Sequence, residues 1–585
     1  MACIAKVGGS SRIRPTQGSF PEFKKGVGDS HRQAQEVAGR KAGVVDFPKL
    51  FVERPAAAET CRERSLSFES KTKHLNFAQR IADKVITVVE KGLENLHWGE
   101  HEPLPSTVDP HVQLEGNFSP VDESPARHNL KVEGNLPDCL EGVYVRNGPN
   151  PQIFPTGRHH LFDGDGMLHA VSFNQGLVSY ACRYTRTYRF MEEEKHGRAF
   201  FPKPIGELHG YGGVARLMVY WARSLFGILD ASQGMGMANA GLVYFNKRLL
   251  AISEDDLPVE VRITEDNDIV TVGRYDFHGQ LTHSMIAHPK IDPHTGELFS
   301  LSYNVLSAPY LKYLIFSADG EKKAEVPVTL DEAAMTHDFA ITENFVVIPD
   351  QEIVFRLKEM LTGGSPVVLD PKKTPRFGVM PKYSTSEEEL QWIDVPGCFF
   401  FHLYNAWEDG DEVVVIGSSM TPADIIFKTS EVPRAILTEV RLNRRMATST
   451  KRELADLNLE VGKMNPQFVG VKTQFIYLAI VEPWPKVSGI AKVDLQSGQV
   501  VARHDYGTDR YGGEPVFVPR TSDSNAAEDD GFLLAFCHNE ASGESELLVL
   551  DAATPSLEPV ASVKLPSRVP YGFHGAFIPA ADLLH

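Results

Sequence analysis

Short apolar or alternating runs recur along the chain after Pro105, and turn residues bound each of them. The clearest runs lie at residues 142–146, 242–245, 249–253, 298–302, 345–349, 412–417, 475–480, 532–536 and 546–550. Runs of this kind predict β-strands, and they are accompanied by few helical patterns and by no alternation of strand with helix. The chain is therefore predicted to be all-β, which leaves a sandwich, a barrel or a propeller.

The length over which these strands continue favours a propeller. The chain has 585 residues, so it forms either several domains or one large closed architecture. No linker-like break interrupts the last ~480 residues, and at roughly seventy residues per blade this length gives about seven blades. Turns at residues 246–248 and 495–499 predict antiparallel hairpins.

The composition argues against several classes of protein. Hydrophobic residues make up 42% of the chain, which is enough for a large core, and the formal net charge is −18. Nucleic-acid binding needs a basic face, so no nucleic-acid partner is expected. The six cysteines are scattered without any Cys-x-x-Cys pair. This pattern indicates a reducing compartment, with neither a disulfide framework nor a zinc knuckle.

Residues 1–65 differ from the rest of the chain. They are rich in Lys, Arg, Ser and Gly and contain few acids. This composition, without a continuous apolar core, resembles an organelle transit peptide rather than a secretory signal. A plain disordered tail is the alternative, and in either case the segment is expected to lie outside the fold.

Residues 66–104 are predicted to form an amphipathic helical segment. Apolar residues between positions 74 and 96 fall on or beside one stripe: Leu75, Phe77, Ala78, Ile81, Ala82, Val85, Val88, Val89, Leu93 and Leu96. Charged residues, among them Asp83 and Glu90, lie opposite. The stripe either packs on the protein's own body or dips into one leaflet of a membrane.

A second apolar segment, residues 214–229, is interrupted by Arg216 and Arg223. No stretch of about twenty uncharged apolar residues exists, so a spanning helix is not expected. Together, the segments 74–96 and 214–229 indicate a protein that touches a membrane surface without crossing the membrane. Residues 105–585 are then the propeller domain.

Four histidines, His288, His337, His402 and His574, lie in apolar surroundings. His402 is inside the run Pro396–Trp407, which reads as a buried strand. A buried imidazole satisfies its two ring nitrogens either with ordinary hydrogen bonds or by giving one of them to a metal. The gaps between the four are too wide for a linear metal motif. They form a cluster only if the chain returns each strand to a common axis.

A series of motifs between about Leu75 and Ile578 resembles one family. The motifs are Arg146-Asn-Gly-Pro-Asn-Pro151, His160-Leu-Phe-Asp-Gly-Asp-Gly-Met167, Ser253-Glu-Asp-Asp-Leu-Pro258, Met285-Ile-Ala-His-Pro289, His337-Asp-Phe-Ala-Ile-Thr-Glu343, Glu482-Pro-Trp-Pro485, Tyr511-Gly-Gly-Glu-Pro515 and Pro570-Tyr-Gly-Phe-His-Gly575. In this order they are similar to those of the carotenoid cleavage dioxygenases. That family implies a seven-bladed β-propeller with helical insertions capping the active-site face.

Within the family, the chain most resembles the plant 9-cis-epoxycarotenoid dioxygenases. The motifs that carry this likeness are Leu104-Pro-Ser-Thr-Val-Asp-Pro110, Lys203-Pro-Ile-Gly-Glu-Leu-His-Gly210, Ala238-Asn-Ala-Gly-Leu-Val-Tyr-Phe245 and Trp484-Pro-Lys-Val-Ser-Gly-Ile-Ala-Lys-Val-Asp494. Pro149, His278 and Thr336 depart from the residues typical of that subgroup. These departures bear on the choice of substrate.

The resemblance implies that His288, His337, His402 and His574 bind one Fe(II) ion per chain on the propeller axis and are the catalytic residues. It also implies three carboxylates behind them, with Glu254 backing His337, Glu460 backing His402 and Glu514 backing His574. A carboxylate that accepts the far ring N–H directs the near nitrogen's lone pair to the metal. From the residues alone, each glutamate is equally compatible with a solvated acid at a strand end. Imidazole also suits zinc, copper and nickel, so iron is implied by the resemblance only.

The expected chemistry is a dioxygenase reaction with dioxygen as co-substrate. Four neutral ligands leave positions for dioxygen, and the protein must hold one double bond of a long apolar substrate beside it. Phe401 and Phe573 each precede an expected ligand, which makes them candidates for the walls of a substrate tunnel or for ordinary core residues. The resemblance implies cleavage of the 11,12 double bond of 9-cis-violaxanthin or 9′-cis-neoxanthin to xanthoxin and an apocarotenal, at the start of abscisic acid synthesis.

Three other functions remain open at this stage. The first alternative is a cleavage dioxygenase with another carotenoid or bond preference. The second is a non-catalytic propeller that binds carotenoid or protein, and the third is a metal-dependent isomerase or hydrolase. The subgroup implies the plastid stroma, with peripheral binding to the thylakoid membrane. The oligomeric state is not indicated by the sequence.

Overall fold

The computed structural model describes residues 75–97, 104–428, 432–523 and 525–583. The predicted transit peptide, residues 1–65, lies outside the described residues. Residues 66–74 and 98–103 of the predicted membrane-contact segment lie outside them as well.

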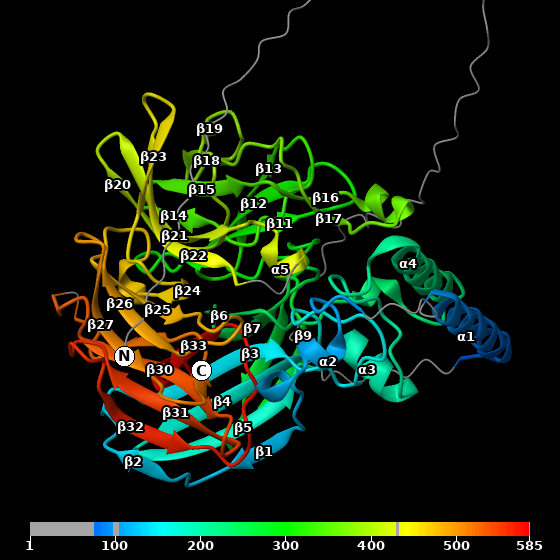
Figure 1. The fold of residues 1–585 in the computed structure, drawn as a ribbon, viewed down its shortest axis with the longest axis horizontal. Coiled ribbons are helices and arrows are strands. Elements are labelled where there is room, and N and C mark those ends of the chain that lie inside the picture. The colour runs from blue at the N-terminus through cyan, green and yellow to red at the C-terminus, as the bar shows by residue number, and fades with distance from the viewer. Residues whose placement is uncertain (1–74, 98–103, 429–431, 524, 584–585) are drawn as a thin grey trace, which may run out of the picture. The chain divides into compact units, whose positions relative to one another are not determined.

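Seven antiparallel sheets form the blades of a propeller, as predicted (Figure 1). Blade 1 contains β33 (Gly575–Pro579), β3 (Gly142–Pro149), β4 (Gly166–Asn174), β5 (Leu177–Tyr184) and β1 (Ser124–Arg127). Blade 2 contains β6 (Gly241–Phe245), β7 (Arg248–Ile252), β8 (Val259–Ile263) and β9 (Ile269–Arg274). Blade 3 contains β10 (Lys290–Ile291), β11 (Leu298–Tyr303), β12 (Leu311–Phe316) and β13 (Lys322–Val328). Blade 4 contains β14 (Ala340–Ile341), β15 (Phe345–Asp350), β18 (Arg376–Pro381) and β19 (Gln391–Asp394).

Blade 5 contains β20 (Phe400–Asp409), β21 (Glu412–Thr421), β22 (Arg434–Asn443) and β23 (Thr448–Glu453). Blade 6 contains β24 (Leu459–Lys463), β25 (Phe475–Ile480), β26 (Gly489–Asp494) and β27 (Gln499–Asp505). In blade 7, β28 (Arg510–Gly512) and β29 (Val516–Pro519) both pair with β30 (Gly531–Asn539), followed by β31 (Glu544–Asp551), β32 (Pro559–Lys564) and β2 (Val132–Gly134). A separate ribbon is formed by β16 (Ile353–Phe355) and β17 (Val367–Leu369).

Strands from the two ends of the chain close the ring. Strand β33, near the C-terminal end of the described residues, pairs with β3 in blade 1, where Ala576 lies opposite Val145. Strand β2 comes early in the chain and pairs with β32 in blade 7, where Val132 lies opposite Val563. Each of these two blades therefore contains strands from both ends of the chain.

The turn between β6 and β7 is shorter than predicted. It contains two residues, Asn246 and Lys247, because Arg248 already pairs with Phe245. Both turn residues have positive φ, at 45° and 60°. Two positive φ values are characteristic of the two-residue turn whose twist matches that of a hairpin.

Helices lie outside the blades. They are α1 (Phe77–His97), α2 (Pro110–Gln113), α3 (Tyr188–His196), α4 (Gly210–Leu225), α5 (Ile425–Lys428) and α6 (Ala580–Leu583), with short 3₁₀ turns at Gly116–Phe118, Ala231–Gln233, Leu357–Thr362 and Pro466–Phe468. Helices α1 and α4 pack against each other beside the propeller (Figure 1). Among the described helices, none is both long and apolar enough to cross a bilayer.

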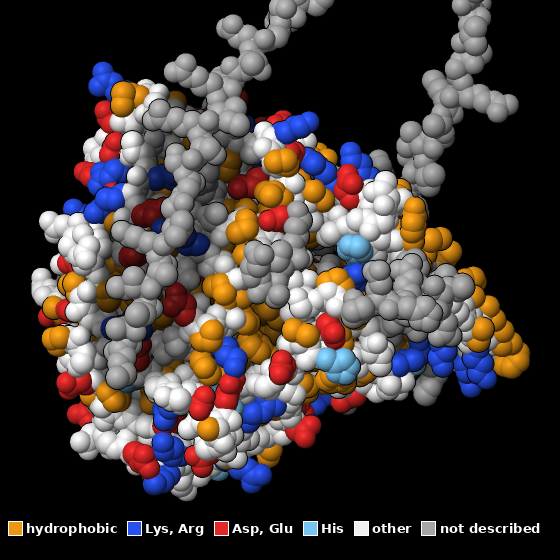
Figure 2. Space-filling model, in the orientation of Figure 1, with side chains coloured by type: hydrophobic (Ala, Val, Ile, Leu, Met, Phe, Trp, Pro, Cys, Tyr) orange, Lys and Arg blue, Asp and Glu red, His pale blue; other side chains and the backbone are white. Residues whose placement is uncertain are grey.

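The predicted apolar stripe of α1 is divided between the protein and the solvent. Leu75, Ala82 and Ile86 pack with α4 and its flanking residues. Several other apolar side chains of the stripe are exposed, namely Phe77, Ala78, Ile81, Val85, Val88 and Val89. Figure 2 shows hydrophobic side chains gathered along this outer edge of the molecule. Packing on the protein's own body therefore explains only part of the stripe.

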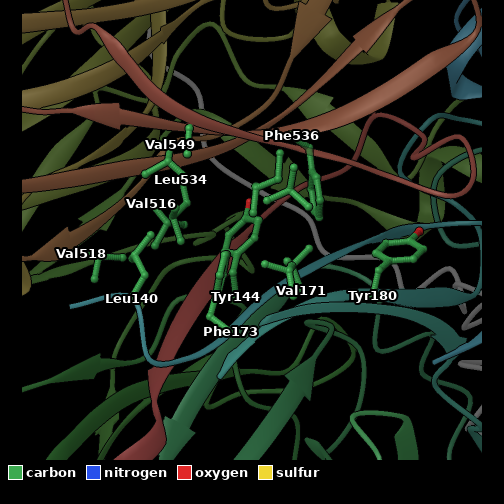
Figure 3. Close-up of a cluster of buried hydrophobic side chains, with 14 of the residues drawn as sticks. Leu140, Tyr144, Val171, Phe173, Tyr180, Val516, Val518, Leu534, Phe536 and Val549 are labelled. Atoms are coloured by element: carbon green, nitrogen blue, oxygen red, sulfur yellow. The ribbon is translucent and has the colours of Figure 1, made fainter. Parts of the chain in front are cut away.

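The hydrophobic core consists of separate clusters between neighbouring blades. One cluster joins Tyr144 and Val171 of blade 1 to Val516, Leu534 and Phe536 of blade 7 (Figure 3). Six further clusters of the same kind fill the other contacts between adjacent blades. Each sheet is thus covered on both faces, so many of its strands are continuously apolar rather than alternating.

Weakening the closing strand is expected to destabilise the ring. Ile578 lies in β33, is fully buried and packs with residues of blades 1 and 2. Truncating a buried Ile to Ala leaves a cavity and costs about 2–5 kcal/mol. We expect Ile578→Ala to lower the midpoint of urea unfolding. Leu177→Ala, at an exposed position in β5, is the matched control and should cost less than ~0.5 kcal/mol. Equal effects of the two substitutions would contradict the closing role of β33.

Candidate metal centre

The four histidines singled out from the sequence lie at the starts of innermost strands in four different blades. His288 precedes β10, His337 precedes β14, and His574 directly precedes β33. His402 is near the start of β20, inside the strand predicted around it. Because innermost strands begin at the same end of a propeller's axis, four residues far apart in the sequence meet there.

The four imidazoles form one compact cluster. Their potential ligand atoms all lie within 4.8 Å of one another. The ring centroids of neighbouring pairs are 4.3 Å apart for His288 and His574, and 5.0 Å apart for His402 and His574. The Nε2 atoms of His288 and His337 are 3.1 Å apart. Two ligands at right angles on an ion with bonds of about 2.1 Å would be separated by about 3.0 Å, so this spacing fits a shared ion.

Carboxylates hold the outer nitrogens of three of these histidines, in the pairing that the resemblance implies. His402 Nδ1 is 2.8 Å from Glu460 Oε2, and His574 Nδ1 is 2.8 Å from Glu514 Oε1. His337 Nδ1 contacts Glu254 Oε1. In the described part of the chain, no carboxylate hydrogen-bonds to His288. Each carboxylate accepts the Nδ1–H and so leaves the Nε2 lone pair directed at the centre of the cluster.

The three glutamates come from the three blades that carry no histidine of the cluster. Glu254 follows β7 in blade 2, Glu460 lies in β24 of blade 6, and Glu514 lies between β28 and β29 of blade 7. All three have poorly exposed side chains, at 15%, 6% and 3% respectively. They are therefore not solvated acids at strand ends. Every blade contributes one residue to the site.

Hydrogen bonds from other residues orient the glutamates. Tyr303 donates its hydroxyl to Glu254 Oε2 at 2.7 Å, and Tyr404 donates to Glu460 Oε2 at 3.1 Å. Lys463 Nζ lies 3.2 Å from Glu514 Oε1. No sequence motif pointed to Tyr303, Tyr404 or Lys463 as part of the site. A local signal existed for Tyr404, two residues from His402 on the same strand, whereas Tyr303 is brought to Glu254 only by the tertiary fold.

Burial and neighbouring charges set the protonation of the cluster. Burial, assisted by the three other imidazoles, holds the pKa of His288 well below its usual value. Burial also lowers the pKa of His574 to about 4, despite the nearby Glu514. Burial acts in the same direction on His402, but the Glu460 carboxylate outweighs it and raises the pKa of His402. His288 and His574 are thus held neutral near pH 7, the form that binds metals.

The cluster fits a metal site. His402 Nε2 is buried and has no hydrogen-bond partner among the described residues. A buried polar atom without a partner is costly, and this one points toward the three other histidines. Four imidazole nitrogens form a donor set that suits iron, zinc, copper or nickel. A divalent ion at the centre would satisfy this nitrogen.

Aromatic rings lie beside the histidines. Phe401 is 4.2 Å from His337, measured between ring centroids. Phe162 is 5.9 Å from Phe401 and 5.5 Å from Phe573, so it joins the two phenylalanines singled out from the sequence. Phe162 was not predicted from the sequence to belong to the site; it comes from the loop between β3 and β4. These rings adjoin an apolar cluster made of Met335, Ile353, Phe399, Phe401, Met420, Ala423, Ile425 and Ile426.

The three positions that depart from the subgroup pattern lie in different surroundings. Thr336 is fully buried next to His337, and its hydroxyl oxygen has no hydrogen-bond partner within the described residues. Pro149 ends β3. His278 is exposed in the connection between β9 and β10. Thr336 is therefore the departure that directly adjoins the histidine cluster.

Fold and site together define a seven-bladed β-propeller with a four-histidine centre on its axis. A sequence profile of the family described as "Retinal pigment epithelial membrane protein" matches residues 117–579. The chain belongs to this family, which also contains the carotenoid cleavage dioxygenases.

Several relatives are similar over most of their length. The "9-cis-epoxycarotenoid dioxygenase NCED6, chloroplastic" of Arabidopsis thaliana is 51% identical, over 86% of this chain and 88% of its own. The "9-cis-epoxycarotenoid dioxygenase NCED1, chloroplastic" of Oryza sativa subsp. japonica is 42% identical, over 82% of this chain and 77% of its own. The "Carotenoid 9,10(9',10')-cleavage dioxygenase 1" of Phaseolus vulgaris is 38% identical, over 86% and 94%.

Solved structures share the fold. The lignostilbene dioxygenase of Pseudomonas brassicacearum is 25% identical with a TM-score of 0.71, covering 82% of this chain and all of that one. A cobalt-substituted Synechocystis apocarotenoid oxygenase is 26% identical with a TM-score of 0.68, covering 81% of this chain and all of that one.

Removing one histidine of the cluster is expected to abolish metal binding. We expect about one equivalent of metal per chain in the parent protein, measured by elemental analysis after dialysis, and far less in His402→Ala. Glu514→Gln should weaken metal binding about 10- to 100-fold, because the amide no longer fixes His574. His294→Ala is the matched control, since His294 is exposed and is not one of the four clustered histidines. Full metal content in His402→Ala would contradict the assignment.

Proposed function

We propose that this enzyme is a non-haem Fe(II) dioxygenase that cleaves the 11,12 double bond of a 9-cis-epoxycarotenoid, with xanthoxin and an apocarotenal as products. The observation that carries the proposal is the four-histidine cluster, backed by three carboxylates, in a chain that is 51% identical to a 9-cis-epoxycarotenoid dioxygenase. This reaction begins abscisic acid synthesis.

In this proposal, His288, His337, His402 and His574 hold the iron, and Glu254, Glu460 and Glu514 hold three of the histidines in place. A ferrous ion there would bind and activate dioxygen. The carboxylates keep the imidazoles from turning, so the ligand set is already organised before any ion or substrate arrives. No side chain is required as an acid, base or nucleophile.

The remaining task of the protein is to position the substrate. Phe162, Phe401 and Phe573 form an aromatic wall beside the histidines. A rigid polyene that lies along this wall has one double bond opposite the centre, and the depth to which the polyene enters decides which bond that is. The apolar cluster next to Phe401 excludes water from the same space. We propose Phe401 and Phe573 as walls of the substrate tunnel on this basis.

Helices α1 and α4 are proposed to dock on a membrane surface. The outer side of α1 exposes Phe77 by 78% and Val88 by 70%, and α4 exposes Met218 by 67% and Leu225 by 83%. Exposed apolar surface of this extent is typical of an interface with a partner or a lipid surface. The basic residues Arg80, Lys84 and Lys91 of α1 are also exposed, which suits the headgroup region of an anionic membrane.

An ionic cluster fixes this orientation of α1. Glu90 is only 4% exposed and accepts hydrogen bonds from Arg216 at 2.6 Å and Arg223 at 2.5 Å. Arg198 is a third partner, at 3.0 Å. Turning α1 to bury its apolar stripe would leave Arg223, which is fully buried, without its carboxylate, and an unpaired buried charge is strongly destabilising. The helix therefore presents apolar residues outward, where a lipid-soluble substrate is found.

The compartment that fits this function is the plastid, with peripheral attachment to the thylakoid membrane. The two 9-cis-epoxycarotenoid dioxygenases named above are described as chloroplastic. Residues 1–65 are proposed to act as the transit peptide.

Product analysis tests the reaction. The iron-loaded protein, incubated with 9-cis-violaxanthin or 9′-cis-neoxanthin in detergent under labelled dioxygen, should give labelled xanthoxin, identified by mass spectrometry. Cleavage at the 9,10 bond would support the alternative that this is a carotenoid cleavage dioxygenase of another specificity. Conversion without incorporated label would indicate an isomerase or hydrolase, and binding without conversion would indicate a non-catalytic protein.

A single charge on the outer face of α1 is expected to weaken membrane binding. Val88→Asp should lower binding to lipid vesicles about tenfold or more, because insertion of a valine side chain is worth about 1.5–3 kcal/mol. Val501→Asp, the same change at an exposed position in β27, is the matched control. Sedimentation with vesicles that contain anionic lipid measures the effect. Unchanged binding of Val88→Asp would contradict docking through α1.

A further inference from the structure

One buried acid joins two of the segments that carry histidines of the cluster. Asp338 directly follows His337, and its side chain is 4% exposed. Its Oδ2 accepts the backbone N–H of Leu403, the residue after His402, at 2.9 Å. Its Oδ1 accepts the backbone N–H of Phe339 at 2.7 Å, which fixes the carboxylate on its own segment. The start of blade 4 is therefore tied to β20 of blade 5, one residue away from each histidine.

Lys290 extends this connection to the segment of His288. It lies two residues after His288, at the start of β10 in blade 3. Its Nζ is 2.7 Å from Asp338 Oδ1 and donates a hydrogen bond to the carbonyl oxygen of Leu403 at 3.3 Å. The Lys290 side chain is 19% exposed, so the pair is largely withdrawn from water. One lysine and one aspartate thus join three blades and bind both backbone groups of Leu403.

The strand that carries His402 is irregular at the point where this pair binds. Strand β20 pairs with β21, and the register shifts once before Leu403 and once after it. A strand with such bulges bends and loses part of its regular ladder of hydrogen bonds. The neighbouring strand alone therefore does not fix the backbone at His402. Asp338 and Lys290 supply two further bonds to the next residue.

His288 is the histidine of the cluster that, within the described residues, has no carboxylate behind its ring. Glutamates hold the rings of the other three. The strand next to His288 is short, since β10 contains two residues and pairs with β11 only. Lys290 is the first of these two residues. Its ammonium group therefore holds the His288 segment to blades 4 and 5 through the main chain, where no carboxylate holds the imidazole.

We propose that Asp338 and Lys290 are positioning residues that set the distances between His288, His337 and His402 around a bound metal ion. This inference rests on the proposed metal centre and is independent of which carotenoid is cleaved. The glutamates control how the imidazoles are turned, whereas the pair of Asp338 and Lys290 controls how far apart their main chains lie. Without the pair, the three ligands are free to separate, so the ion is bound in an altered geometry and released faster.

Cobalt(II) binding tests this role, because a structural relative has been solved in a cobalt-substituted form. The visible absorption of Co²⁺ depends on the number and geometry of its ligands. Asp338→Asn keeps the size of the side chain and removes its charge, and Lys290→Met keeps the length and removes the ammonium group. We expect each variant to shift the cobalt absorption band. Each should also release cobalt to a chelator about tenfold faster or more, the usual cost of losing a residue behind a metal ligand.

The double variant decides whether the two residues act as one unit. Because they act through one contact, the release rate of the double variant should be close to that of either single variant. Multiplied effects would indicate two independent contributions and would overturn the pair. Folding is checked by circular dichroism. Asp338 keeps its two backbone N–H donors in Lys290→Met, so this variant carries the test should Asp338→Asn not fold.

Lys492→Met is the matched control for a general loosening of the ring. Lys492 is 5% exposed, its Nζ is 2.6 Å from Asp529 Oδ2, and it donates to the carbonyl oxygen of Ala552 at 3.0 Å. It joins blades 6 and 7 with the same chemical groups, but it lies in β26, the third strand of its blade. Neither Asp529 nor Ala552 is next in sequence to a histidine of the cluster. We expect Lys492→Met to lower the midpoint of urea unfolding as Lys290→Met does, and to keep the cobalt spectrum and release rate of the parent protein.

The outcomes separate this inference from the function proposed above. An unchanged cobalt spectrum and release rate in both Asp338→Asn and Lys290→Met would overturn the assignment. An equal acceleration in Lys492→Met would also overturn it, because it would indicate a loss of stability alone. If the parent protein binds no metal, the proposed metal centre fails and this assignment fails with it. Because metal binding is the readout, failure to cleave a carotenoid would count against the proposed reaction and not against the role of this pair.

Discussion

A ring of seven sheets closes only if every sheet is covered on both faces, and the rest of the structure depends on this packing. Each interface between neighbouring blades contains its own buried apolar cluster, including the one between the first and last blades, where strands from both ends of the chain meet. Because protein interiors are close-packed, the blades hold fixed positions around the axis. The innermost strands then carry their first residues to the same place.

This arrangement explains how a site can be built from one residue per blade. Four blades supply histidines and three supply glutamates, and each glutamate comes from a blade other than that of the histidine it holds. The hydrogen bonds between them therefore link different blades as well as fixing the imidazoles. A displacement of one blade would separate a carboxylate from its histidine, so the integrity of the ring and the geometry of the site are coupled.

The blades pack through apolar clusters, whereas the outer helix α1 is also held by a buried ionic cluster. Helix α1 packs partly through Glu90, which lies among three arginines, and leaves most of its apolar stripe exposed. A buried ionic cluster of this kind contributes less to stability than to the choice of one orientation over another. The exposed apolar side chains of α1 and the apolar cluster around Phe401 both suit a lipid-soluble substrate. Such a substrate would move from a lipid phase to the histidines without contact with water.

The sequence by itself determined the all-β class, the strands around residues such as Val145 and His402, the family and, through its motifs, the four histidines with their three glutamates. These features can be predicted because they depend on local patterns, namely apolar runs between turns and short motifs around each functional residue. Tertiary structure alone decided the contacts between residues that share no motif, namely Tyr303 with Glu254, Phe162 with Phe401 and Phe573, and Glu90 with Arg223. For the same reason, the sequence did not determine which face of α1 packs against the protein. A helical stripe shows which residues share a face, but the charges that decide which face is buried lie on α4 and on Arg198, more than a hundred residues away in the chain.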